Sequence, residues 1–210
     1  MSNYQLFQND LPLKTLKSFK GNIAIDTETL GLNIKRDRLC LIQLRNESNK
    51  KVYLIKFDQS ISPTNSKNIK SLLENKSLTK IFHYARFDMA VLKQNLNINV
   101  RNVFCTKIAS KLTRTYSSKH GLKDLVQEIL NIELDKTEQT SDWSQKKLSK
   151  QQIQYAMNDV LYLSDLKKNL ESKLFEAKRL KTFKSIMNFL DTRVGLDLMG
   201  WENTDIFAHK

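Results

Sequence analysis

Short runs of branched apolar residues alternate with polar, turn-forming segments through the first half of the chain. Three of these runs lie at residues 22–28, 39–45 and 52–57, and each has the length of one strand. The pattern predicts three adjacent strands of one sheet. Two further apolar runs, at 80–84 and 102–106, predict two more strands, so we expect a five-stranded sheet.

Apolar positions with helical spacing dominate the rest of the chain. Early strands followed by alternating elements and then by helices are typical of an α/β fold with a mixed sheet flanked by helices. The 210 residues suffice for one well-packed domain and contain no convincing linker, so residues 1–210 are predicted to form a single domain. The predicted helices lie at 11–18, 69–73, 87–96, 106–114 and 121–130, and a long one runs from about Ser149 into 167–184.

The last stretch of the chain, residues 185–210, is too apolar to lie free in water. We expect it either to cover the chain's own core or to form an oligomer contact with a neighbouring molecule. Its apolar residues are Ile186, Met187, Phe189, Leu190, Leu196, Leu198, Met199, Trp201, Ile206 and Phe207.

The chain has a formal net charge of +13, and 27 of its 35 basic residues are Lys. Clustered Lys and Arg favour polyanions such as nucleic acid, because their contacts with phosphates release condensed counterions. The many Lys, Asn and Ile residues are equally what an AT-rich genome would produce without selection for binding. Both explanations stay open.

The cysteines and the N-terminus indicate the compartment. Cys40 and Cys105 lie in predicted strands, without metal-ligand spacing or a disulfide framework, so we expect them to be reduced core residues. The N-terminus lacks an apolar signal segment, and no apolar run reaches the roughly 18 residues that span a bilayer. We expect a cytoplasmic protein with no membrane contact.

Two carboxylates, Asp26 and Glu28, lie at the end of the first predicted strand. Side chains alternate along a strand, so these two point to the same face as Ala24, whereas Ile23 and Ile25 point to the other. Two like charges this close raise one pKa, and a divalent cation removes that penalty. Mg²⁺ binds through one or two protein carboxylates, so the pair indicates either a metal site or a solvated turn.

Two other predicted elements contain acids that could also be metal ligands. Asp88 lies in the first turn of the helix after strand 80–84, where an Asp is also favoured by the free N–H groups of the helix. Tyr155 and Asp159 are four residues apart on the late helix and therefore share one helical face. Taken alone, Asp88 is also explained as a helix cap. Tyr155 and Asp159 are also explained as a packed tyrosine and a surface acid.

Together these motifs resemble the three exonuclease motifs of the DEDD superfamily, tyrosine subclass (DEDDy), the group that contains ribonuclease D. The chain has 26-DTE-28, then Asp88 after a strand, then Tyr155-x-x-x-Asp159 on a late helix. The histidine subclass has its His five positions before the last Asp, and Gln154 occupies that position here. The tyrosine subclass is therefore the better match.

Longer segments extend the resemblance along nearly the whole chain. They are 26-DTETLGLNIKRDRLCLIQL-44, 81-IFHYARFDMAVL-92, 104-FCTKIASKLTRTYSSKHGLK-123, 141-SDWS-144 and 200-GWENTDIFAH-209. These segments are similar to the nano-RNase C family of alphaproteobacteria, which are exonucleases of short oligoribonucleotides. The resemblance implies an RNase H-like exonuclease domain, a ring-shaped homo-octamer, and short single-stranded RNA down to diribonucleotides as substrate, with DNA also open.

The resemblance also implies a two-metal-ion hydrolysis from the 3′ end that releases nucleoside 5′-monophosphates. Asp26 would bridge two Mg²⁺ or Mn²⁺ ions. Glu28 and Asp159 would complete one site, and Asp88 would help to hold the other. Tyr155 would orient the attacking water and help to take its proton, although a phenol with a pKa of about 10 is a weak base at neutral pH.

Candidate substrate-binding residues lie near these motifs. Leu32 resembles a leucine wedge between the last two bases, and it is equally explained as an ordinary loop leucine. Tyr84, beside a strand end, could stack on a base. Arg114, Lys119 and His120 precede a helix and could bind a 5′-phosphate through charge-assisted hydrogen bonds, or form a plain polar loop.

Two other functions stay open. The first is a broader ribonuclease D-like 3′-5′ exonuclease that acts on longer RNA or DNA ends. The second is an inactive nucleic-acid-binding module that keeps the fold. The presence of all five motif residues favours an enzyme over an inactive module.

Overall fold

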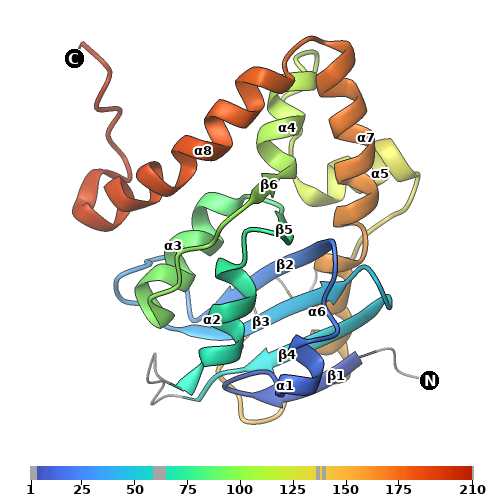
Figure 1. The fold of residues 1–210 in the computed structure, drawn as a ribbon, viewed down its shortest axis with the longest axis vertical. Coiled ribbons are helices and arrows are strands. Elements are labelled where there is room, and N and C mark those ends of the chain that lie inside the picture. The colour runs from blue at the N-terminus through green and yellow to red at the C-terminus, as the bar shows by residue number, and fades with distance from the viewer. Residues whose placement is uncertain (1–3, 59–64, 136–137, 139–140, 210) are drawn as a thin grey trace.

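A mixed sheet of six strands forms the centre of the molecule (Figure 1) in the computed structural model, which describes residues 4–58, 65–135, 138 and 141–209. The strands are β1 (Tyr4–Gln8), β2 (Asn22–Thr29), β3 (Leu39–Asn46), β4 (Lys51–Lys56), β5 (Thr79–Phe82) and β6 (Val103–Cys105). Their order in the sheet is β1-β4-β3-β2-β5-β6. β2, β3 and β4 pair antiparallel, whereas β1 joins β4, and β5 joins β2 and β6, in parallel.

Strand β1 was not expected, so the prediction of five strands is corrected to six. It lies at the edge of the sheet and pairs with β4 alone, from Tyr4 opposite Val52 to Gln8 opposite Lys56. An edge strand half-buries only some of its residues, and here Leu6 is exposed. Its apolar pattern is therefore weaker than that of the central strands.

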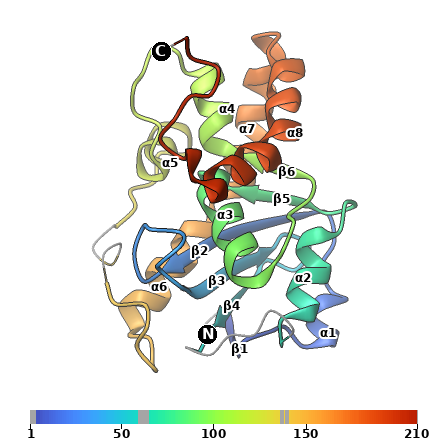
Figure 2. The same ribbon diagram turned by 90° about the vertical axis from the view of Figure 1, so that its left-hand side faces the viewer.

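Helices cover both faces of this sheet, and α3 and α6 lie on opposite faces (Figures 1 and 2). Among the described residues, no helix is both long enough and apolar enough to cross a bilayer. The helices are α1 (Leu13–Leu16), α2 (Lys67–Glu74), α3 (Ala85–Leu96), α4 (Thr106–Thr113), α5 (Leu122–Leu130), α6 (Lys150–Leu161), α7 (Leu163–Glu176) and α8 (Leu180–Leu196).

Two apolar cores result, one on each face of the sheet. Ile23 and Ile25 of β2 belong to the core that α2, α3 and a portion of α8 complete. Ala24 belongs to the core that α5, α6 and α7 complete. The alternation read from the sequence is thus confirmed. It also fixes the side on which the next two residues of the same parity, Asp26 and Glu28, must project.

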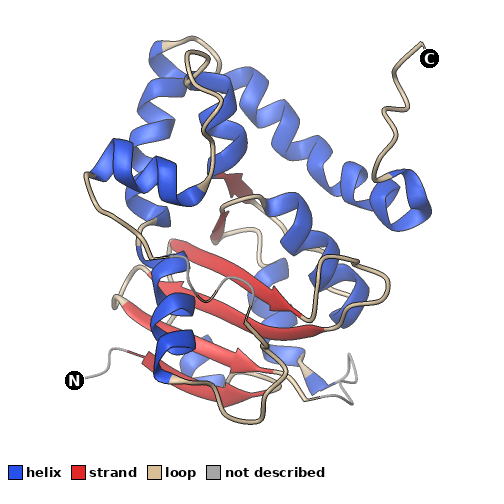
Figure 3. Cartoon of the chain, turned by 180° about the vertical axis from the view of Figure 1, so that it is seen from behind, coloured by secondary structure: helices blue, strands red, loops and turns tan. Residues whose placement is uncertain are grey.

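The predicted long helix from Ser149 into 167–184 is divided into α6, α7 and α8. Figure 3 shows the helices and the sheet from behind. α6 gives way to α7 at Tyr162, and α7 ends before Lys178, whose backbone is left-handed with φ 57°. Neither break contains a proline or a glycine, so the sequence pattern does not reveal these helix ends. After α8 a π-helical turn, Asp197–Trp201, contains Gly200 at φ 108°, a conformation that favours glycine.

Candidate active site

Asp26 and Glu28 lie on the part of β2 that extends beyond its pairing with β5. Pairing with β5 ends at Ala24, whereas pairing with β3 continues to Thr29, with a bulge between Glu28 and Thr29. At Asp26 and Glu28, β2 therefore pairs with β3 on one side and is no longer paired with β5 on the other. Bulges are frequent beside active sites because they re-aim side chains.

Helix α6 brings two further groups to the same place. One carboxylate oxygen from each of Asp26, Glu28 and Asp159 lies within 4.8 Å of the other two. Tyr155, one turn before Asp159 on the same face, has a side-chain hydrogen bond with it. The structure thus brings together the DxE pair and the late Tyr-x-x-x-Asp motif.

Asp88 comes from the first turn of α3, as the sequence predicts, and is buried beside the other acids. The Thr27 hydroxyl donates a 2.7 Å hydrogen bond to its Oδ1. Thr27 lies between Asp26 and Glu28 but on the other face of β2. Asp88 therefore approaches the cluster across the edge of the strand, and its negative charge acts on both Asp26 and Glu28.

The cluster is electrostatically strained without a cation. Burial, followed by repulsion from the other acids, raises the pKa of Asp26 and of Glu28 well above ordinary values. Burial raises the pKa of Asp88 to about 7, against the opposing hydrogen bond from Thr27. In the described portion of the chain, no ion pair joins Asp26, Glu28 or Asp88 to a Lys or Arg.

This donor set fits a hard divalent cation. Carboxylate oxygens are the ligands that Mg²⁺ and Mn²⁺ prefer, and the repulsion within the cluster is the penalty that a cation removes. Gln43 of β3, opposite Asp26, donates a 3.3 Å hydrogen bond to Glu28 and holds it in place. The acids that would ligate a metal are therefore both close together and oriented.

Tyr155 is held as a phenol. Burial, and then the charges of Asp159, Glu28 and Asp26, raise the pKa of its hydroxyl above the ordinary value. Its ring packs at 5.9 Å from that of Trp143, measured between centroids. The group is therefore set up to donate a hydrogen bond into the site.

Hydrogen bonds hold the loop that contains Trp143 against α6 and β4. Ser149 and Gln152 form a capping box at the start of α6, and the Gln152 amide also donates to the Ser141 hydroxyl and to the Asp142 carbonyl. From β4, the buried Lys56 ammonium donates to the Trp143 carbonyl at 3.2 Å. These contacts fix Trp143 against Tyr155.

A cavity of about 580 Å³ opens over the acids. Leu32, whose side chain is highly exposed, lines it from the loop after β2, and Tyr84 lines it from the start of α3. Beside Leu32, a Cβ at Gly31 would overlap the Asp37 carboxylate, which would then have to move. The sequence-predicted positions of Leu32 and Tyr84 at the cavity agree with substrate contact.

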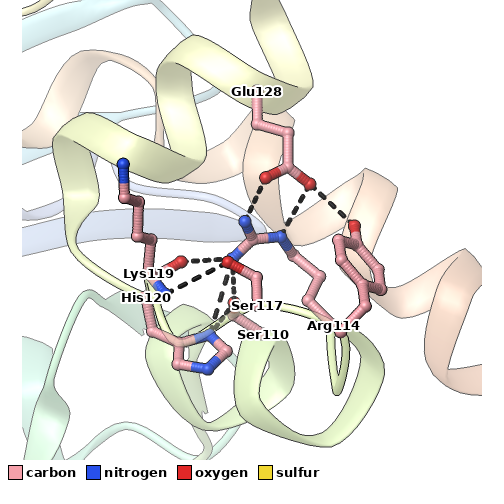
Figure 4. A network of polar contacts seen from close by, with 7 residues as sticks. Ser110, Arg114, Ser117, Lys119, His120 and Glu128 are labelled. Atoms are coloured by element: carbon pink, nitrogen blue, oxygen red, sulfur yellow. Dashed lines mark hydrogen bonds and ion pairs between the residues drawn. The ribbon is translucent and has the colours of Figure 1, made fainter.

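Arg114, Lys119 and His120 belong to a different arrangement (Figure 4). Arg114 is fully buried, and its guanidinium forms a bidentate ion pair with Glu128. The same guanidinium donates to the Ser110 hydroxyl at 3.0 Å and to the Lys119 carbonyl at 2.6 Å. His120 Nδ1 lies 2.8 Å from the Ser110 hydroxyl.

For Arg114, this network corrects the predicted contact with a 5′-phosphate, whereas Lys119 and His120 stay predictions. The donors of Arg114 are already used within the chain, and the described residues that line the acid cavity include Gly121 and Leu122 but neither Arg114, Lys119 nor His120. The sequence of a polar loop before a helix does not show whether its side chains bind a ligand or pair with a carboxylate of the next helix. The geometry favours a structural role for Arg114.

Several residues that line the cavity were not predicted from the sequence. Lys107, on α4, lines the cavity, as do Trp143 and His83. His83 Nδ1 lies 2.9 Å from the Thr106 hydroxyl. Gln43, which supports Glu28, could have been predicted, because a Gln within an otherwise apolar strand indicates a buried polar contact. The position of Lys107 depends on how α4 packs, which no local pattern reveals.

Acids from one strand and two helices, gathered at the edge of a mixed sheet under an open cavity, define a metal-dependent phosphodiester hydrolase. The family comparison makes this class specific: residues 6–175 match the 3′-5′ exonuclease family, and the chain belongs to it.

Solved structures of high similarity include Brucella melitensis NrnC bound to pGG. It is 45% identical, has a TM-score of 0.92, and the match covers 99% of this chain and 98% of that one. Brucella melitensis NrnC with bound Mg²⁺ is 44% identical, with a TM-score of 0.91 and 99% of each chain covered. These structures confirm the RNase H-like exonuclease fold and the similarity to nano-RNase C.

Ribonuclease D of Bartonella henselae is 29% identical over 170 residues, which is 81% of this chain and 40% of that protein. The chain thus spans less than half the length of the curated relatives of this type that it matches. The predicted relationship to ribonuclease D is confirmed for the catalytic domain.

Proposed function

We propose that this chain is a metal-dependent 3′-5′ exoribonuclease that hydrolyses short oligoribonucleotides, down to diribonucleotides, to nucleoside 5′-monophosphates. The observation that supports it most is the convergence of Asp26, Glu28 and Asp159 within 4.8 Å, with Asp88 beside them. The binding of pGG and of Mg²⁺ by Brucella melitensis NrnC supports a short nucleic acid as substrate and a divalent cation as cofactor.

Asp26, Glu28, Asp88 and Asp159 are the residues that would hold two Mg²⁺ or Mn²⁺ ions. When bound, such ions neutralise charge on the scissile phosphate and lower the pKa of a bound water. The acids themselves give the site its selectivity for cations, because their mutual repulsion is relieved only when positive charge enters the cluster.

Tyr155 keeps its proton, since burial and three neighbouring carboxylates raise its pKa. This favours a role as a hydrogen-bond donor that orients the water or a phosphate oxygen. In the hydrolysis, the water oxygen bonds to phosphorus and the bond to the 3′-oxygen of the preceding nucleotide breaks. A 3′-hydroxyl and a nucleoside 5′-monophosphate result.

Leu32 and Tyr84 are proposed to contact the bases. Both line the cavity, and both are exposed to solvent, Leu32 to 84% and Tyr84 to 44%. An exposed leucine at the mouth of a cavity is suited to separating a pair of stacked bases, and an exposed aromatic ring is suited to stacking on one.

The end of the chain is proposed to contact a second copy. Met199, Trp201, Ile206 and Phe207 are all exposed on the isolated chain. This apolar surface supports a homo-oligomer, and the ring-shaped octamer implied by family resemblance is the form we propose. Sedimentation velocity of the wild-type chain and of Phe207→Ser, with a smaller assembly expected for the variant, checks it.

A product time course tests the proposed function. Labelled oligoribonucleotides of two to seven nucleotides, and one of twenty, are incubated with the protein with Mg²⁺ or with EDTA. We expect Mg²⁺-dependent release of mononucleotides, fastest from the shortest substrates. Equal or faster cleavage of the longest one would favour the broader ribonuclease D-like activity, and no release under any condition would favour the inactive module.

Replacing the phenol tests the role of Tyr155. We expect Tyr155→Phe to lower kcat about 100-fold, which is typical for the loss of one oriented donor, while the Mg²⁺-induced rise in Tm is kept. Steady-state kinetics and thermal unfolding measure the two quantities. Tyr162→Phe, at the end of the same helix, is the control, and a kcat for Tyr155→Phe equal to that of this control would exclude the role.

A further inference from the structure

A cavity of about 460 Å³ opens at the outer edge of the sheet, beside β6. Residues of β6, α3, α7 and α8 line this edge cavity. In the described portion of the chain it shares no lining residue with the acid cavity. Its volume falls within the roughly 300–1,000 Å³ that is usual for small-molecule sites. The molecule therefore has room for a ligand away from the acids.

The outer side of β6 presents a backbone donor and a backbone acceptor to the edge cavity. Val103 lies opposite Lys80 of β5, and the Lys80 N–H donates to the Asn102 carbonyl at 2.9 Å. In a parallel pair a residue bonds to the two neighbours of its partner, so Val103 turns its own N–H and C=O away from β5. Outside the β5–β6 pairing, no hydrogen bond of the described residues uses either group. Val103 also lines the cavity.

A flat heterocycle fits this edge better than an added strand. β6 has only three residues, and α7 and α8 line the cavity beside it, so a strand of another chain would find little to pair with. Each nucleobase has a donor beside an acceptor on its pairing edge, which matches the N–H and C=O of one residue. Met89, Phe183 and Met187 give the cavity apolar walls, and methionine packs well against flat rings.

Positive charge gathers at the rim of the edge cavity. Lys184 is exposed there and forms no ion pair within the residues that the structure describes. Arg101 pairs with Asp191 through Nη1 at 3.2 Å, which leaves other donors of its guanidinium for a second anion. Lys167 is paired with Glu171 at 2.7 Å. A ligand with a ring and an anionic group is therefore matched at both ends.

The edge cavity also borders the helix that contains a catalytic acid. Met89, one of its apolar wall residues, follows Asp88 directly on α3. Asp191, at the rim, pairs with Lys93 of the same helix at 3.5 Å. A ligand in this cavity would thus contact α3 on a side that the acid cavity does not use.

We propose that the edge cavity binds a nucleoside 5′-monophosphate, and the choice of this ligand rests on the proposed function, whose product it is. The N–H and C=O of Val103 bind the pairing edge of the base. Phe183 and Met187 pack against the ring, and Lys184 and Arg101 bind the phosphate. Product then has a site on this chain that is separate from the acids that release it.

Equilibrium dialysis in EDTA tests the site, with labelled adenosine 5′-monophosphate (AMP), ribose 5-phosphate and adenosine as probes of the full chain. Without metal, the crowded carboxylates of the acid cavity repel a phosphate, so binding in EDTA reports the edge cavity. We expect AMP to bind at one site per chain. Ribose 5-phosphate lacks the base and adenosine lacks the phosphate, so each is expected to bind at least about tenfold more weakly.

Lys184→Glu places the phosphate contact. We expect this variant to weaken AMP binding by at least about tenfold and to leave adenosine binding within about twofold of the wild type. Lys181→Glu is the matched control, because Lys181 is an exposed lysine of the same helix and is not among the described residues that line the cavity. It should bind AMP like the wild type.

Three results would overturn the proposal: no binding of AMP in EDTA, equal binding of AMP and ribose 5-phosphate, or equal losses of AMP binding in Lys184→Glu and Lys181→Glu. The last two would mean that the basic surface attracts anions without a built site. A chain that binds AMP in EDTA but releases no mononucleotide from RNA with Mg²⁺ would contradict the proposed function and leave the site standing. The two failures are thus distinguishable.

Discussion

Asp26→Asn is expected to lower turnover by at least about 1,000-fold while making the metal-free protein more stable. Asp26 belongs to the set of three carboxylates within 4.8 Å, and its pKa is raised by burial and by Asp88, Asp159 and Glu28. An amide keeps the shape of the side chain but removes one of these charges. Repulsion falls, and with it the affinity for cations.

Turnover of a labelled diribonucleotide with Mg²⁺, and urea unfolding with EDTA, measure the two effects. Asp165→Asn, an exposed Asp on α7, is the matched control and should change neither. If Asp26→Asn cleaved at a rate near that of the wild type, and EDTA still stopped the reaction, the metal site would have to lie elsewhere.

Without metal, the free energy of unfolding is expected to fall as the pH rises from about 5 to about 8. Asp88 has a pKa of about 7 in the folded chain, against 3.8 as the ordinary value. Between these values the folded chain holds a proton that the unfolded chain has released, so raising the pH favours unfolding. About two pH units separate pH 5 from the folded pKa, so at about 1.4 kcal/mol for each unit Asp88 alone accounts for roughly 3 kcal/mol of this fall.

Urea unfolding in EDTA at about pH 5 and about pH 8 gives this difference, and Asp88→Asn should reduce it. The Oδ1 of the new amide can still accept the hydrogen bond from Thr27, so the local packing is kept. Addition of Mg²⁺ at the higher pH should restore stability to the wild type. A variant that shows the same pH dependence as the wild type would mean that Asp88 titrates normally.

The features of the site that depend on local pattern were accessible from the sequence. Alternation along β2 places Asp26 and Glu28 on one face, and helical spacing places Tyr155 and Asp159 together. The first-turn position of Asp88 follows from the strand that precedes it. Such rules describe residues that are neighbours along one element, and they are confirmed here.

The features that depend on packing between elements were not accessible. Arg114 lies in a polar loop whose composition suits a phosphate site, but α5 places Glu128 against it. Lys107 looks like any lysine on an amphipathic helix, and only the approach of α4 to Tyr84 gives it a place in the cavity. An edge strand such as β1 buries too little surface to show in the pattern.

The salt bridges of Asp197 join the segment after α8 to α3, the helix that contains Asp88. Asp197 is almost fully buried and holds Arg86, two residues before Asp88 on α3, together with Arg193 on α8. Shortening the protein by the residues after α8 would remove this shared anion and leave two guanidinium groups uncompensated. The segment after α8 supplies none of the described residues that line the acid cavity. Through Asp197 it instead stabilises the position of α3, the helix that contains Asp88.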